Sequence, residues 1–64
     1  MGLVQEYYDR YKNILDRERR ILFAIVSDLR ARSSLREGWE MIDEEIQEEV
    51  LQKWLSLIQR YVNS

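Results

Sequence analysis

The stretch 33–38, which reads SSLREG, decides the fold that the sequence predicts, because it separates two long segments of helical composition. Ser34 and Glu37 have the spacing of a capping box, in which two side chains satisfy free backbone N–H groups at the start of a helix. Residues 1–36 carry eight basic and five acidic side chains, whereas residues 37–64 carry two basic and seven acidic ones. The stretch therefore predicts a turn between two segments of opposite net charge.

On either side of this stretch little interrupts a helix, since the chain has no proline and its two glycines are Gly2 and Gly38. On a helical wheel, at about 100° per residue, the apolar residues of the first segment form one stripe. They are Val4, Tyr7, Tyr8, Tyr11, Ile14, Leu15, Ile21, Leu22, Ile25, Val26 and Leu29. We expect helices at about 3–32 and 38–62, joined by a turn at about 33–37.

The fold class predicted for the single domain 1–64 is all-α, an antiparallel two-helix hairpin. Near the end of the second helix the apolar arc is about 160° wide, whereas one packing face needs only ~100°. Its members are Val50, Leu51, Trp54, Leu55, Leu57, Ile58, Tyr61 and Val62. A hairpin of this size is also marginally stable by itself, because small domains bury little apolar surface. We therefore expect two hairpins to dimerise into a four-helix bundle, or the chain to be a small subunit of a larger protein complex.

The candidate interface combines this arc with the tyrosines of the first helix, since tyrosine and tryptophan are enriched where protein chains bind each other. In an antiparallel hairpin these groups meet at the end away from the turn. The candidate interface residues are Tyr7, Tyr8, Tyr11, Leu51, Trp54, Leu55, Ile58, Tyr61 and Val62. Ordinary packing in the core of the chain is the alternative interpretation. Phe23 lies off the apolar stripe, and we expect it to be exposed.

Glu18 is a carboxylate at the centre of the apolar stripe, where burial without a partner is costly. If the chain turns near 34–36, position 18 faces Gln52 and Lys53 on the second helix. We predict that Glu18 pairs with Lys53, or with Gln52, and fixes the register, as single polar residues do in coiled coils. The alternative is that this part of the stripe is exposed to solvent.

The arginines of the first helix support a second class of function. If Arg17, Arg19, Arg20 and Arg30 contact phosphates, the chain is a small nucleic-acid-binding regulator. The wheel divides these four side chains between the two sides of the stripe, and the net charge of the chain is −2. We therefore favour ion pairs with carboxylates over nucleic-acid binding. The acidic residues of 40–49 are expected to form a solvated face that suits the N-terminal half of a helix.

The composition excludes several classes of site. The chain has neither cysteine nor histidine, which excludes disulfides and Cys/His zinc sites and removes the commonest general base. The longest apolar run, 21–26, is far shorter than the roughly 20 residues that cross a bilayer. We expect no cofactor, no enzymatic activity and no membrane segment. The predicted function is a cytoplasmic, non-catalytic protein–protein interaction or assembly module, whose partner is a second copy or a larger protein.

Overall fold

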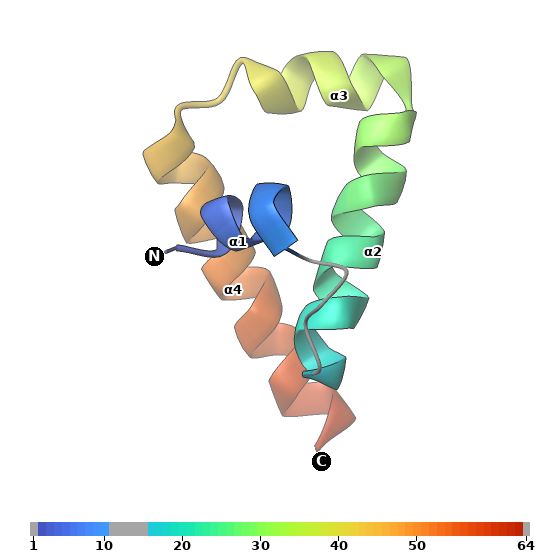
Figure 1. The fold of residues 1–64 in the computed structure, drawn as a ribbon, viewed down its shortest axis with the longest axis vertical. Coiled ribbons are helices and arrows are strands. Elements are labelled where there is room, and N and C mark those ends of the chain that lie inside the picture. The colour runs from blue at the N-terminus through green and yellow to red at the C-terminus, as the bar shows by residue number, and fades with distance from the viewer. Residues whose placement is uncertain (1, 11–15, 64) are drawn as a thin grey trace.

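The computed structural model describes residues 2–10 and 16–63, and this part of the chain forms helices without any strand. The helices are α1 (Leu3–Arg10), α2 (Arg17–Ala31), α3 (Ser33–Glu40) and α4 (Glu44–Val62). The long helices α2 and α4 run in opposite directions, α3 bridges one end of the pair, and α1 lies between them in projection (Figure 1). The all-α class is confirmed, while the arrangement differs from a two-helix hairpin.

The expected helix over 3–32 is interrupted, because α2 has an N-terminus of its own. Asp16 has an extended backbone, with φ −64° and ψ 118°, and its side chain accepts a hydrogen bond from the N–H of Glu18 at 3.1 Å. Arg19 donates to the other oxygen of Asp16 at 2.5 Å. An aspartate that caps a free N–H group is the usual way to begin a helix. The chain can therefore change direction before α2, and α1 packs separately.

The expected turn at 33–37 is also replaced, because these residues are the first part of α3. The backbone turns instead at Arg32, which has φ −99° and ψ 114°, and again between Glu40 and Glu44. Arg32 is the N-cap of α3 and makes no side-chain cap, so the predicted capping box of Ser34 and Glu37 does not form at the helix start. Two corners and a bridging helix thus stand where one tight turn was expected.

The corner between α3 and α4 is held by a buried amide. The side chain of Gln47 donates a hydrogen bond of 2.7 Å to the carbonyl oxygen of Trp39, which lies at the end of α3. The Trp39 ring stacks on Trp54, with ring centroids 6.1 Å apart and an interplanar angle of 22°. This corner therefore combines a satisfied polar group with aromatic packing, which fixes how α3 crosses to α4.

The core lies where α1, α2 and α4 meet. Its buried apolar residues are Leu3, Val4, Leu22, Phe23, Val26, Trp39, Leu51 and Leu55. Phe23 is fully buried rather than exposed, because the Tyr7 ring packs edge-on against it at 5.6 Å and the Tyr7 hydroxyl hydrogen-bonds with that of Ser27 at 3.0 Å. Packing against α1 turns the buried face of α2 towards Phe23 and leaves Ile25 half exposed.

Candidate protein-interaction surface

The start of α1 is capped by a side chain of α4, and this contact decides which face of α4 is covered. Oε2 of Glu48 accepts a hydrogen bond from the N–H of Leu3 at 2.9 Å, and Oε1 accepts one from Val4 at 3.0 Å. Gln52 donates to the same carboxylate at 2.7 Å. Free N–H groups and the positive end of the helix dipole both favour a carboxylate there. Glu48 thereby fastens α1 to one side of α4.

These hydrogen bonds lower the pKa of Glu48. Burial acts to raise this pKa, but the N–H groups of Val4 and Leu3, and then Gln52, stabilise the ionised carboxylate more strongly. Gly2 makes room for the contact, since a Cβ at this position would lie 2.5 Å from Oε1 of Glu48. The sequence interpretation placed Glu48 on a solvated face and so missed this role. The one hint of this role in the sequence is that Gly2, which precedes α1, has no side chain that could cap the helix.

The opposite side of the α2–α4 pair carries an apolar groove. It is lined by Leu22, Ile25, Trp54, Leu57 and Ile58. Ile25 is 50% exposed and Leu57 is 37% exposed. The volume of the groove, about 280 Å³, lies below the ~300–1,000 Å³ of typical small-molecule pockets. A shallow apolar groove of this size suits a few side chains of another protein chain better than an enclosed ligand.

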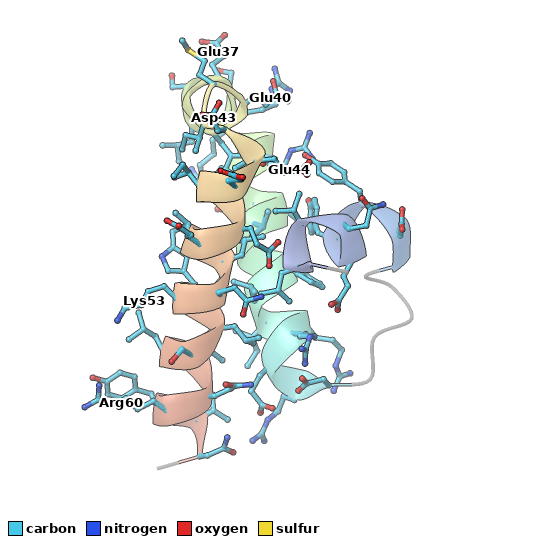
Figure 2. All side chains as sticks on the ribbon, turned by 90° about the vertical axis from the view of Figure 1, so that its left-hand side faces the viewer. Glu37, Glu40, Asp43, Glu44, Lys53 and Arg60 are labelled. Atoms are coloured by element: carbon cyan, nitrogen blue, oxygen red, sulfur yellow. The ribbon has the colours of Figure 1, made fainter. Side chains whose placement is uncertain are left out.

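Exposed charged residues border the groove along α4. Lys53 and Arg60 lie on the side of α4 away from α1, and Glu37, Glu40, Asp43 and Glu44 cluster towards the other end of the molecule (Figure 2). Glu49 precedes Lys53 by one helical turn and lies beside it, whereas Glu45 is turned further towards α1; both glutamates line a hollow with Gly2, Val4 and Gln5. The flank of α4 that carries Glu49, Lys53 and Arg60 is thus acidic in its first half and basic in its second.

The predicted interface residues of α4 are divided between the core and the surface. Leu51 and Leu55 are buried within the chain, so neither is available to a partner in this arrangement. Trp54 and Ile58 are half-buried and line the groove. Tyr61 and Val62 are exposed near the end of α4. Of the five residues that line the groove, the candidate interface included Trp54 and Ile58 but neither Leu57 of α4 nor Leu22 and Ile25 of α2.

The predicted interface residues of the first segment lie elsewhere. Tyr7 is half-buried against Phe23, and Tyr8 is 55% exposed beside the guanidinium of Arg30, which lies 4.9 Å from its ring centroid. Tyr11 lies outside the described residues. Tyr7 and Tyr8 thus flank the α1 side of the molecule, while the groove opens on the other side.

The predicted register pair is not formed as expected. Glu18 lies in the first turn of α2, and its carboxylate pairs with the neighbouring Arg17 at 3.4 Å. Lys53 is exposed, and across the described residues it takes part in no ion pair with Glu18. The pairing rested on one continuous helix over 3–32. Once α2 begins at its own cap, Glu18 is a helix-start residue.

The same cap involves Asp16 and Arg19. A hydrogen bond with the Glu18 side chain, followed by those from Arg19 and the Glu18 N–H, holds the pKa of Asp16 below its usual value. Arg19 also lies 3.4 Å from Glu6 of α1. An acidic and basic cluster therefore surrounds the start of α2 and links it to α1.

The arginines that would contact nucleic acid are mostly paired. Arg17 binds Glu18, and Arg19 binds Asp16 and Glu6. Arg30 approaches Glu40 at 3.4 Å and lies over the ring of Tyr8. Arg20 is exposed on α2. Among the residues that the structure describes, these carboxylate partners reduce the positive charge that a phosphate backbone would need.

Across residues 2–10 and 16–63, no group of three acidic side chains is placed to hold a metal ion. Among the helices that the structure describes, none combines the length and the apolar character that crossing a membrane requires. Comparison of the chain with protein-family models, with curated proteins and with solved structures finds no match.

Proposed function

We propose that this protein is a non-catalytic protein–protein interaction module, and that the groove between α2 and α4 receives apolar side chains of another protein chain. The observation that carries the proposal is the combination of Ile25 and Leu57, both substantially exposed, on either side of one groove. Burial of apolar surface contributes about 25 cal/mol per Å², so covering these side chains favours association.

The composition of the groove supports a protein partner over a small molecule. Its five lining residues are all apolar, and Lys53, which precedes the groove residue Trp54 in α4, is exposed. Protein interfaces share this pattern of an apolar centre and a polar rim, with tryptophan enriched at the centre. Specific small-molecule sites instead place a few polar groups inside the pocket.

Two kinds of partner satisfy the proposal. A second copy of the chain would bring its own α2 and α4 to the groove, which completes a four-helix bundle from two helix pairs. A larger protein would contribute one or two helices to the same place, and the chain would then be a small subunit of an assembly. Both arrangements cover the groove and leave α1 on the outside.

Site-specific photo-crosslinking in cells that make the protein tests the proposal. A photoreactive phenylalanine analogue at Leu57 should give crosslinks to a protein chain, whereas the same analogue at Leu35 should not. Leu35 is a matched control, because it is 52% exposed but lies on α3, outside the groove. Equal crosslinking at both positions, or none at Leu57, would contradict an interaction through the groove.

A further inference from the structure

We infer that the occupant of the groove is a second copy of this chain, whose α4 lies antiparallel to the first about a two-fold axis at the middle of the helix. The inference rests on the proposed function, since it names the partner of the same groove. The axis would pass near Lys53 and Trp54, which are midway between the ends of α4. The two copies of α4 would then overlap along their whole length.

The apolar residues on the outer side of α4 are spaced symmetrically about this axis. They recur at helical spacing, at Ile46, Val50, Trp54, Leu57 and Tyr61. In an antiparallel pair, Ile46 lies level with Tyr61 of the second copy, and Val50 lies level with Leu57 of the second copy. Trp54 lies next to Trp54 of the second copy. Every apolar residue of this stripe therefore meets another, as a two-fold interface requires.

The charged flank of α4 selects the antiparallel direction. Glu49 precedes the axis, and Arg60 follows it. In the antiparallel pair, Arg60 of each copy lies on the same side as Glu49 of the other and within about 3 Å of level with it, at ~1.5 Å per residue. A parallel pair would instead turn this flank of each copy towards the opposite flank of the other, so Glu49 and Arg60 would not meet.

The residues near the axis are compatible with this pairing. Lys53 of both copies lies close to the axis, but its long side chain is exposed and can point outwards to water. Ile25 of α2 lines the same groove, so α4 of the second copy would contact α2 as well as α4. Two copies of α2 and two of α4 would then pack around one apolar centre, and α1 would remain outside.

Sedimentation equilibrium of the full chain tests whether the partner is a second copy. We expect a dimer at micromolar concentration. Leu57→Glu should weaken it by on the order of a hundredfold, because the change places a carboxylate in the apolar centre of each copy. Leu35→Glu makes the same change on α3 and should leave the dissociation constant unaltered. Circular dichroism of each variant confirms that the helices are retained.

Charge reversal tests the direction and register. Arg60→Glu places a carboxylate beside Glu49 of the second copy, and Glu49→Arg places an arginine beside Arg60 of the second copy. Each variant alone should dimerise on the order of tenfold more weakly. An equimolar mixture should recover dimerisation, because opposite charges then meet at both ends. Arg36→Glu, an equal charge change on α3, is the matched control and should have no effect.

The outcomes separate this inference from the proposed function. A wild-type chain that stays monomeric at hundreds of micromolar overturns the two-fold dimer, and the proposed function survives only if Leu57 still crosslinks to a different protein. A dimer that resists Leu57→Glu overturns the groove as its interface. A dimer in which the charge-reversed variants bind as well alone as when mixed overturns the antiparallel register of α4.

Discussion

At the scale of single residues, Glu48 and Gly2 show how one carboxylate can fix the place of a whole helix. The carboxylate replaces the missing N-cap of α1, and the glycine lets it approach the backbone. Ordinary sequence patterns look for a cap within a few residues of a helix start. A cap that comes from 45 residues away leaves no such pattern, so it could not be predicted from the sequence.

Two glycine substitutions with opposite outcomes test this contact. Gly2→Ala should lower the free energy of unfolding by about 1 kcal/mol, because the added Cβ displaces the Glu48 carboxylate and α1 loses its cap. Gly38→Ala adds the same methyl group in the middle of α3, where nothing lies within 4 Å. It should raise stability by about 0.5–1 kcal/mol, since alanine favours a helix more than glycine does. Urea unfolding measures both; equal effects of the two changes would contradict the contact.

The lowered pKa of Glu48 makes the cap dependent on pH. Because the folded-state pKa lies below the ordinary value of 4.5, the stabilisation is complete above that value and is lost as the pH falls through the folded-state pKa. Glu48→Gln should lower the free energy of unfolding by about 1 kcal/mol near neutral pH, and the difference from wild type should shrink in acid. Urea unfolding of both proteins from pH 7 to pH 3 measures this, and a difference independent of pH would exclude the ionised cap.

At the scale of helices, composition and periodicity predicted the all-α class but not the number of helices. The absence of proline made one long helix over 3–32 and another over 38–62 plausible. Two aspartates nevertheless precede helix starts. Asp16 caps α2 with its side chain, whereas Asp43 precedes the acidic first turn of α4 and makes no side-chain hydrogen bond there. These are recognised start signals, but the apolar stripe continued across them and concealed both breaks.

The sequence predicted only part of the face that each helix buries. A helical wheel assumes that one helix packs on one neighbour, and α2 packs on both α1 and α4. The buried position of Phe23 follows from contact with Tyr7 of α1, and the exposure of Ile25 follows from the same rotation. The wide apolar arc predicted on α4 includes Trp54, Leu57 and Ile58 of the groove, whereas the wheel gave no sign that Ile25 of α2 is exposed there.

The corner between α3 and α4 should depend on the buried amide of Gln47. Gln47→Glu keeps the shape of the side chain but removes the N–H donor and places a carboxylate near the Trp39 carbonyl oxygen. We expect a loss of about 2–3 kcal/mol in the free energy of unfolding near neutral pH, and a smaller loss in acid, where a protonated carboxyl can donate again. Gln59→Glu, an exposed position of α4, should change stability little. Thermal unfolding at pH 7 and pH 4 decides, and equal effects at the two positions would contradict the role of Gln47.

At the scale of the whole molecule, the sequence has two halves of opposite net charge, residues 1–36 and 37–64. Across the described residues, most ion pairs nevertheless join residues of the same half. Arg19 joins α2 to Glu6 of α1, and Arg30 approaches Glu40 of α3, which is the one ion pair between the two halves among residues 2–10 and 16–63. The remaining charge separation lies along α4. In the proposed antiparallel pair, this separation of charge along α4 would bring Arg60 of one copy to Glu49 of the other.

If folding and pairing are linked, thermal stability should depend on protein concentration. A partner that binds only the folded chain raises the midpoint of unfolding as its concentration increases. We expect the Tm of the wild type to rise by several degrees between 5 and 500 μM, and the Tm of Leu57→Glu to stay constant. Circular dichroism at matched path lengths measures both. A constant Tm for the wild type would contradict linkage between folding and self-association.

The cap of α1 by Glu48 also sets an order of events during synthesis. α1 leaves the ribosome before α4, and the carboxylate that completes it is translated 45 residues later. An eight-residue helix is unstable alone in water, so we expect the N-terminal segment to remain unstructured until α4 has emerged. α1 then forms only after α4, and nascent chains stalled before α4 should expose Leu3 and Val4 to proteases and chaperones.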